Sequence, residues 1–211
     1  MAENYFMNQK IWQDFAHKYN LSPEQIQQFQ EYYKLLIAWN KKINLTAITE
    51  ESEVLTYHLE DSLHLSRCYD IKSTHMLADI GTGAGLPGIP LKIVFPHIAI
   101  VLVEVIQKKV IFLREVIQEL GLQNIEVVDM DWRTFLRKTA YPVDLICARA
   151  SLRPDELTRM FQQSSAYKNA RLIYWASVGY EIGSKEAPFF ERSCDYAVGD
   201  KTRSYYFFAR K

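Results

Sequence analysis

The sequence is short of the features that mark several large classes of protein. Its 211 residues include only three cysteines, Cys68, Cys147 and Cys194, which lie far apart and form neither a metal-ligand spacing nor a disulfide framework. The amino terminus lacks a basic segment followed by an apolar stretch, and no apolar run approaches the roughly 18 residues of a membrane span. These absences predict a soluble protein of the reducing cytoplasm, without a membrane attachment and without a bound metal.

A net charge is also absent. Lys and Arg together number 25, as do Asp and Glu, so the formal net charge is zero. Such a chain can contact a nucleic acid only through a local basic patch. With 48% hydrophobic and 24% charged residues, the composition is typical of a globular protein. The length suits either one compact domain of about 150 residues with an extension or one slightly large domain.

Glycine is scarce but concentrated. Half of the eight glycines fall within residues 81–88, after a short apolar run that ends at Asp79 and before the helix-like stretch 89–95. Because glycine accepts positive φ easily, this loop can fold tightly and expose backbone N–H groups. The start of the helix adds a partial positive charge beside them. The segment therefore predicts a nucleotide-binding loop at the carboxyl end of a strand.

Strand-like and helix-like segments alternate after Met76, which predicts an α/β fold with a doubly wound, mostly parallel sheet. We expect helices at residues 107–120, 132–138 and 154–167. Seven strands are expected, at residues 77–80, 98–103, 125–128, 143–147, 170–175, 194–198 and 204–209.

The first part of the chain, residues 1–75, is predicted to be a helical extension packed on a body formed by residues 76–211. Residues 4–20 carry apolar side chains at helical spacing. A second helix is expected to begin at Ser22 and to end near Asn40, because serine, proline and then glutamine form a capping box at its start.

Two polar segments follow that helix. Residues 39–46, rich in asparagine and lysine, suit a turn that hydrogen-bonds its own backbone and exposes its charges. A short helix expected from Glu51 carries His58 and Asp61 three residues apart, where they can pair with each other or cap another element.

Glu104 lies nineteen residues after Gly85, at the end of the second expected strand. In doubly wound folds, a carboxylate about 20 residues past the glycine loop accepts hydrogen bonds from ribose hydroxyls. This spacing predicts an adenosine bound across the first two strands.

Two classes of cofactor fit the glycine loop. Residues 83–88 formally satisfy the G-x-G-x-x-G pattern of dinucleotide sites, whereas residues 79–85 have the form found in S-adenosylmethionine-dependent methyltransferases. Asp79 favours the second class, because its carboxylate attracts the cationic methionyl end of S-adenosylmethionine and repels a pyrophosphate. Pro87 also lacks the N–H donor that a pyrophosphate needs. A nicotinamide-dependent oxidoreductase remains the alternative at this point.

Four segments together resemble the glucose-inhibited division protein B family, whose members are bacterial small-subunit (16S) ribosomal RNA guanine-N7 methyltransferases. The resemblance covers nearly the whole chain and is strongest from Trp39 to Leu120. It is carried by Trp39–Thr46 (WNKKINLT), His58–Ser62 (HLEDS), Asp79–Leu91 (DIGTGAGLPGIPL) and Lys108–Leu113 (KKVIFL).

The resemblance implies a class I S-adenosylmethionine-dependent methyltransferase fold, with the helical extension in front of it. It also implies that Arg149 lies beside the cofactor, where it would position the reactants. Together with the loop, the expected cofactor contacts are Asp79, Gly81, Thr82, Gly83, Gly85, Leu86, Glu104, Trp132, Arg133 and Arg149.

Methylation of guanine N7 needs no proton abstraction, because this atom carries a free lone pair. Catalysis then consists mainly of alignment and electrostatics, on a base that is exposed from its stack. The implied partner is small-subunit ribosomal RNA or the assembling small subunit, and we expect a monomer. The basic candidates for the RNA surface are Lys41, Lys42, Lys108, Lys109, Arg114, Arg133, Arg137, Arg149 and Arg153. Of these, the expected RNA contacts are Lys41, Lys42, Lys108, Lys109 and Arg153.

Two positions depart from the family pattern. Arg133 stands where the family usually has an acidic residue, and Trp175-Ala176-Ser177 stands in place of a Leu-Lys-Gly segment. The alternatives are therefore a degenerate member that binds cofactor or RNA without this activity, or a methyltransferase with a different substrate.

Overall fold

The structure, a computed structural model, describes residues 8–149 and 152–211. Seven strands form one sheet in the order β3-β2-β1-β4-β5-β7-β6, parallel except where β7 pairs with β5 and β6. This confirms the predicted mostly parallel, seven-stranded sheet. The strands are β1 (Met76–Ile80), β2 (Ala99–Glu104), β3 (Ile125–Asp129), β4 (Leu145–Arg149), β5 (Arg171–Ser177), β6 (Phe190–Val198) and β7 (Lys201–Phe208).

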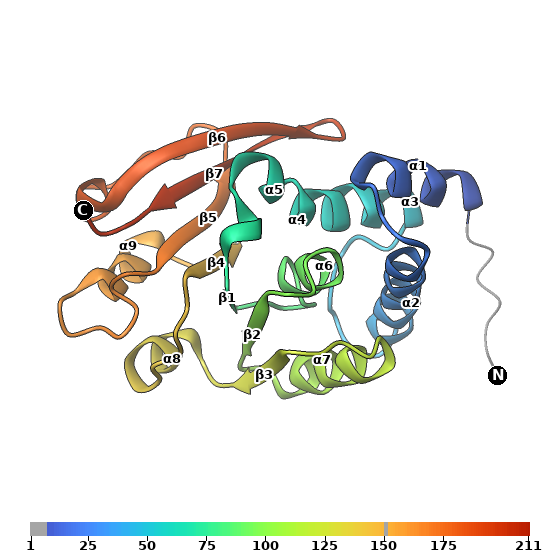
Figure 1. Ribbon diagram of the computed structural model, residues 1–211, viewed down its shortest axis with the longest axis horizontal. Coiled ribbons are helices and arrows are strands. Elements are labelled where there is room, and N and C mark those ends of the chain that lie inside the picture. The colour runs from blue at the N-terminus through green and yellow to red at the C-terminus, as the bar shows by residue number, and fades with distance from the viewer. Residues whose placement is uncertain (1–7, 150–151) are drawn as a thin grey trace.

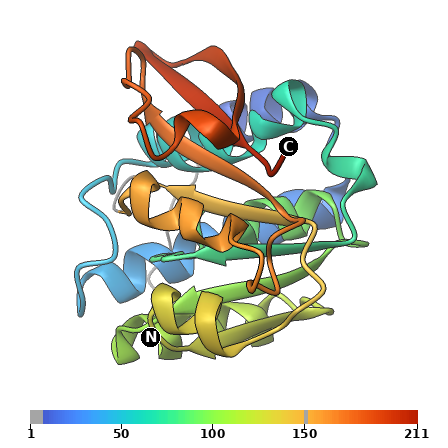
Figure 2. The ribbon, with the colours of Figure 1, turned by 90° about the vertical axis from the view of Figure 1, so that its left-hand side faces the viewer.

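Helices cover both faces of the sheet (Figure 1). On one face lie α2 (Pro23–Asn40), α6 (Gly88–Val94) and α7 (Gln107–Glu119), and on the other lie α8 (Trp132–Lys138) and α9 (Pro154–Leu157). Figure 2 views the molecule from the side of α8 and α9. Successive strand residues point to opposite faces, so the sheet separates two hydrophobic cores. None of the helices in the described part of the chain is long and apolar enough to cross a membrane.

The helix α2 packs beside α6, and α1 (Gln9–Tyr19) packs on α2 through the rings of Trp12 and Phe15. The predicted capping box begins α2: the Ser22 hydroxyl accepts from the Gln25 N–H at 3.2 Å, and the Gln25 side chain accepts from the Ser22 N–H at 2.9 Å. Farther along α2, the Tyr32 hydroxyl donates to the Ala84 carbonyl in the glycine loop at 2.7 Å. The helix therefore supports the loop from below. Of the helix expected over residues 4–20, the first four residues lie outside the described part.

The polar segment after α2 forms the predicted turn. The Asn40 side chain accepts from the N–H groups of Leu45 (2.8 Å) and Thr46 (3.0 Å) and donates to the Thr46 carbonyl (2.9 Å). A helical stretch follows, made of α3 (Glu51–Val54), the π-helix η1 (Leu55–Glu60), α4 (Asp61–Leu63), α5 (Leu65–Cys68) and the 3₁₀ turn η2 (Ile71–Ser73).

The helix expected at residues 154–167 was predicted too long. The α-helix α9 ends at Leu157, and a 3₁₀ turn η3 (Thr158–Phe161) follows it. Ser164 and Ser165 favour a turn over helix continuation, and the Ser165 N–H donates to the Gln162 carbonyl at 3.0 Å in such a turn. Tyr167 then turns into the core, where its ring stacks on Phe135 with centroids 5.3 Å apart. A second short 3₁₀ turn, η4 (Ala187–Phe189), precedes β6.

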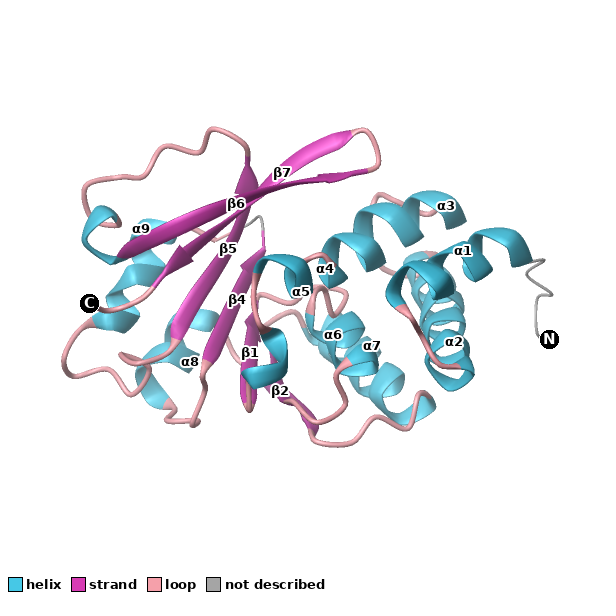
Figure 3. Cartoon of the chain, turned by 45° about the horizontal axis from the view of Figure 1, so that its top comes forward, coloured by secondary structure: helices cyan, strands magenta, loops and turns pink. Residues whose placement is uncertain are grey.

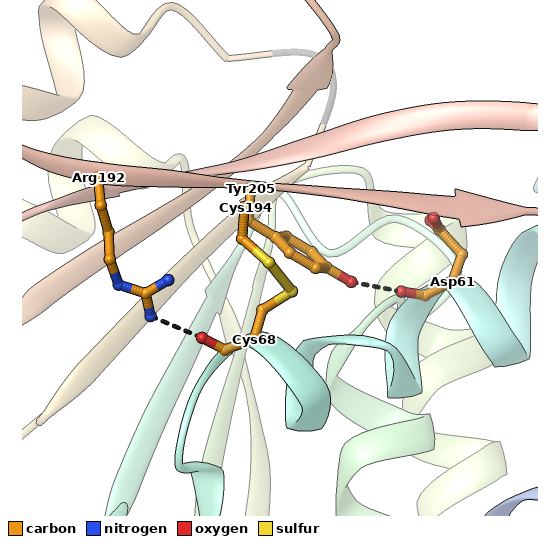
Figure 4. Close-up of a disulfide and its surroundings, with 5 residues drawn as sticks. All are labelled: Asp61, Cys68, Arg192, Cys194 and Tyr205. Atoms are coloured by element: carbon orange, nitrogen blue, oxygen red, sulfur yellow. Dashed lines mark hydrogen bonds between the residues drawn. A yellow bond between two sulfur atoms is a disulfide. The ribbon is translucent and has the colours of Figure 1, made fainter.

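The prediction that the cysteines form no disulfide was wrong. Cys68 at the end of α5 is bonded to Cys194 in β6, across 126 residues of sequence, while Cys147 is buried and free. The hairpin of β6 and β7 crosses above α4 and α5 (Figure 3), which places the two cysteines together. Beside the disulfide, Arg192 donates to the Cys68 carbonyl at 2.6 Å (Figure 4). The cysteines therefore no longer indicate a reducing compartment.

The disulfide is expected to stabilise the fold, because it closes a long loop in the unfolded chain. Reduction with dithiothreitol should lower the free energy of unfolding by about 2 kcal/mol or more. The double variant Cys68→Ser, Cys194→Ser should unfold identically with and without reductant. Urea unfolding of both proteins measures the difference, and a wild-type curve that reductant does not move would contradict the link.

Candidate functional site

The glycine loop folds back over the carboxyl end of β2. The N–H of Gly81 donates to the Val103 carbonyl at 2.9 Å, and φ is +70° at Gly81 and +61° at Gly83, values that glycine adopts without strain. An alanine at Gly83 would have enough space, since no atom lies within 4 Å of the position of its Cβ, but the positive φ would strain it. The loop thus keeps its surface free of side chains at the point where a ligand can approach.

Glu104 fixes this loop through three backbone donors. One carboxylate oxygen accepts from the Gly83 N–H at 3.0 Å, and the other accepts from the N–H groups of Val105 and Ile106, each at 2.9 Å. The side chain is nearly buried at the end of β2. Its first role in the structure is therefore to hold the loop against the strand end, and the ribose contact expected from the sequence stays a prediction.

Asp79 lies beneath the loop and is 1% exposed. Its Oδ2 accepts from the Thr82 hydroxyl at 2.6 Å and from the Gly88 N–H at 2.8 Å. Burial raises the pKa of Asp79 to about 6, against the opposing effect of these two hydrogen bonds. The other oxygen, Oδ1, is buried and has no partner among the described residues. At neutral pH the loop therefore covers an ionised carboxylate with one oxygen unsatisfied.

A cavity of about 210 Å³ opens beside the loop, at the carboxyl ends of β1, β2 and β3. In open α/β sheets, ligands bind at this edge near the point where the strand order reverses. The cavity is smaller than the roughly 300 Å³ of the smallest typical ligand pockets, so it fits one part of a nucleoside cofactor. It is lined by Gly81, Gly83, Val103, Glu104, Val105, Ile106, Lys109, Met130, Asp131, Trp132 and Leu152.

Four of the expected cofactor residues line this cavity, namely Gly81, Gly83, Glu104 and Trp132. The others do not. Asp79, Thr82 and Leu86 are buried under the loop, and Gly85 has its Cβ position occupied by the Ile89 side chain, 2.5 Å away. Arg133 points elsewhere, because its guanidinium pairs with Glu156 at 2.6 Å and lies over the Trp132 ring.

Arg149 is outside the cavity lining and is held by a buried carboxylate. Its Nη2 lies 3.1 Å from Asp61 Oδ2 and donates to the Tyr57 carbonyl at 3.0 Å. Asp61, which is fully buried, also accepts from the hydroxyl of Tyr196 (2.7 Å) and from Arg203 (2.8 Å). Nη1 of Arg149 is buried with no partner among the described residues. The arginine at the end of β4 is thus anchored by the helical segment, whose Asp61 is held in turn by the carboxy-terminal hairpin.

His58 and Asp61 do not pair with each other; each binds another element. The His58 ring lies 2.7 Å from the Thr46 hydroxyl and 3.1 Å from the Tyr57 carbonyl. Burial lowers the pKa of His58 to about 4, so the ring is neutral at physiological pH. It joins η1 to the turn after α2 and leaves no acid–base dyad here.

The cations expected to contact RNA fall in different places. Lys41 and Lys42 are exposed after α2, with the Lys42 ammonium 5.4 Å from the Trp39 ring. Lys108 is exposed at the start of α7, whereas the next residue, Lys109, lines the cavity. Arg153 is exposed and pairs with Asp155 at 3.2 Å.

Several residues of the cavity are not among those predicted from the sequence. Val105 and Ile106 directly follow the buried strand β2 but are 55% and 49% exposed. Two consecutive apolar residues after a strand-ending glutamate were a signal for an apolar ligand surface. Asp131 was also missed, although its side chain caps α8 by accepting from the N–H groups of Arg133 (3.0 Å) and Thr134 (3.1 Å), a recognisable helix start.

The strand order, the antiparallel last strands and the cavity beside the glycine loop define the fold of the class I S-adenosylmethionine-dependent methyltransferases. A SAM-dependent methyltransferase from Aquifex aeolicus is similar, with a TM-score of 0.56 and 17% identity over 82% of this chain and 98% of that chain. A single-residue mutant of MtNAS in complex with S-adenosylmethionine has a TM-score of 0.56 and 16% identity over 95% of this chain and 84% of its own.

The chain belongs to the rRNA small subunit methyltransferase G family, GidB, whose profile matches residues 25–182. The protein of that name from Lachnoclostridium phytofermentans is 43% identical over 143 residues, which are 67% of this chain and 59% of the relative. The one from Geobacillus thermodenitrificans is 40% identical over 67% of this chain and 60% of its own length. The match thus spans about 60% of the length of these curated relatives.

Proposed function

We propose that the protein is an S-adenosylmethionine-dependent methyltransferase that modifies guanine N7 in small-subunit ribosomal RNA. The observation that carries this proposal is the family match over residues 25–182, which includes the glycine loop and every residue of the cavity beside it. The relatives named rRNA small subunit methyltransferase G support the substrate.

The residues present fit this cofactor. Gly81 and Gly83 leave the loop free of side chains, and Ile106 and Trp132 add apolar surface suited to a purine. The unsatisfied, buried oxygen of Asp79 provides negative charge on the side of the loop where we place the cationic methionyl group. When bound, S-adenosylmethionine supplies a methyl group activated by the adjacent sulfonium.

The protein itself has to orient the acceptor base and exclude orientations in which N7 does not face the methyl group. Guanine N7 carries a free lone pair, so no side chain has to remove a proton first. We assign Arg149 the part of a positioning residue, because Asp61 and the Tyr57 carbonyl hold its guanidinium while Nη1 keeps an unused donor. The remaining cofactor assignments, including Thr82, Gly85, Leu86 and Arg133, act by shaping or bracing the site and do not line the cavity.

We also propose that the chain has two parts, an amino-terminal helical extension, residues 1–75, that supports the site and a methyltransferase domain, residues 76–211, that carries it. We further propose that the protein works as a monomer in the cytoplasm, on ribosomal RNA or on the assembling small subunit. Light scattering of the purified protein tests the monomer, and a dimeric mass at micromolar concentration would reject it.

A second candidate is a family member that binds cofactor without methyl transfer. Arg133 is engaged by Glu156, and Trp175, at the family's Leu-Lys-Gly position, is buried against Tyr205. Calorimetry with S-adenosylhomocysteine tests the part that both candidates share. Absence of binding at millimolar concentration rejects both, whereas binding without transfer to any ribosomal RNA favours the second.

Cofactor binding is expected to weaken below about pH 6. Protonation of Asp79 removes the charge that attracts the methionyl ammonium, and a pKa of about 6 gives an affinity loss of at most about tenfold between about pH 7 and about pH 5. Because the folded pKa lies above the ordinary value, protonation of this group favours the fold, so unfolding through Asp79 does not explain the loss. Calorimetry with S-adenosylhomocysteine across this range measures it.

The variant Asp79→Asn serves as the comparison for this pH profile. It should bind more weakly at neutral pH and lose the dependence on pH in this range. A variant that keeps the wild-type profile would show that another group titrates.

A further inference from the structure

A second and larger cavity, of about 630 Å³, lies on the face of the sheet that carries α8 and α9, the face seen in Figure 2. Trp132 lines both cavities, so this one begins beside the proposed cofactor site. We call it the arginine groove. Its lining consists of Trp132, Arg133, Leu136, Arg137, Thr139, Glu156, Arg159, Met160, Gln162, Ser164, Ser165 and Ala166.

The arginine groove concentrates positive charge in a chain whose formal net charge is zero. Three guanidinium groups line it against one carboxylate, that of Glu156, which is already paired with Arg133. Arg137 uses its Nε to donate to the Arg133 carbonyl at 3.2 Å. Within residues 8–149 and 152–211, neither Arg137 nor Arg159 forms an ion pair. Two exposed guanidinium groups therefore remain available to an anionic partner.

The placement of these arginines follows from the local helices. Arg133 and Arg137 are four residues apart on α8, so they share one face of that helix, and Arg159 stands on the opposite wall in η3. From Trp132 to Thr139 the wall extends about 10 Å, at about 1.5 Å per residue. The lining also offers hydroxyl and amide donors, from Ser164, Ser165 and Gln162, and apolar surface from Leu136 and Met160.

We propose that the arginine groove binds the phosphate backbone of the RNA substrate beside the target nucleotide. Guanidinium groups match phosphate oxygens with two parallel hydrogen bonds, and the apolar residues suit a ribose or a base face. The length of the wall exceeds that of a single nucleotide contact, and its charge opposes that of RNA. This inference rests on the proposed function and adds the path of the substrate strand, which none of the lysines predicted from the sequence indicates.

The test uses the double variant Arg137→Gln, Arg159→Gln, with Lys138→Gln as the matched control. Lys138 is exposed on the same helix and next to Arg137, but it does not line the groove. The probe is an in vitro transcript of small-subunit ribosomal RNA, and its affinity is measured by filter binding at several salt concentrations. Affinity for S-adenosylhomocysteine is measured in parallel.

The double variant is expected to bind the transcript about tenfold more weakly, with a salt slope reduced by about 1.4, because each lost phosphate contact of a single strand removes about 0.7. Its affinity for S-adenosylhomocysteine should not change, and Lys138→Gln should resemble the wild type. Unchanged RNA binding in the double variant, or an equal loss in the control, overturns the proposal that the arginine groove binds RNA, while leaving the proposed methyl transfer intact. A wild-type protein that neither binds nor methylates the RNA rejects both.

Discussion

Replacing Asp61 with alanine is expected to lower the free energy of unfolding by about 3 kcal/mol or more, the effect of removing one partner from a buried ion pair. Asp61 is fully buried, and its carboxylate pairs with Arg149 and Arg203 and accepts a hydrogen bond from the Tyr196 hydroxyl. Without the carboxylate, two guanidinium groups lie next to each other in a poorly solvated place. Urea unfolding monitored by circular dichroism measures the loss.

Asp195→Ala is the control for this variant, because Asp195 is an exposed carboxylate on β6 whose removal should change stability by less than about 0.5 kcal/mol. The Asp61→Asn variant should fall between the two, since an amide keeps the volume but not the charge. Equal stability of the Asp61 and Asp195 alanine variants would show that the buried Asp61 carboxylate does not stabilise the fold. Because Arg149 depends on Asp61, the folded fraction of Asp61→Asn should also methylate more slowly than the wild type.

Replacing Glu104 with alanine is expected to lower the affinity for S-adenosylhomocysteine by about 100-fold, equivalent to about 2.7 kcal/mol. The N–H groups of Gly83, Val105 and Ile106 all donate to this one carboxylate. These hydrogen bonds are only partly buried, so water can satisfy some of the freed donors, and the main effect is that the loop and the strand end lose their common acceptor and should shift away from their present positions. Calorimetry with S-adenosylhomocysteine measures the loss.

Glu119→Ala, an exposed carboxylate at the end of α7, is the matched control and should bind like the wild type. Glu104→Gln removes the charge but keeps one acceptor oxygen. That oxygen can accept either from the Gly83 N–H or from the N–H groups of Val105 and Ile106, but not from both sides. Wild-type affinity in Glu104→Ala would show that the loop does not depend on this residue.

Local signals in the sequence were sufficient for most of the fold. Ser22 and Gln25 announce the start of α2 within four residues, and the expected bounds of α8 agree with the structure. The strands also lie within a few residues of their expected places, because buried parallel strands read as short apolar runs. The helix after Pro154 was overestimated, since its polar second half favours turns and no local pattern marks where Tyr167 enters the core.

Contacts across long sequence separations could not be predicted in this way. Cys68 and Cys194 are 126 residues apart, and Arg203 reaches Asp61 from 142 residues away. Both pairs depend on how the β6–β7 hairpin lies over the helical segment, and that arrangement is set by the packing of whole elements. The sequence carried the residues of these pairs without any spacing that joins them.

In the candidate site, too, local features were predictable from the sequence and contacts between distant residues were not. The glycines marked the loop, because the positive φ found at Gly81, Gly83 and Gly85 is a conformation that glycine favours. The direction of Arg133 was not readable, since Glu156 on another helix determines it. Asp79 and Glu104 were selected as ligand contacts, yet in the structure both hold the loop through its own N–H and hydroxyl groups. Their contacts with a ligand remain predictions.

The central claim, methyl transfer to guanine N7, is tested most directly with ribosomal RNA from cells that lack this protein. The RNA is incubated with the purified protein and methyl-labelled S-adenosylmethionine, digested to nucleosides and analysed by mass spectrometry. We predict one labelled 7-methylguanosine per small-subunit RNA, at a site that is unmodified in the deletion strain. Absence of label, or label confined to another nucleoside, would contradict the account.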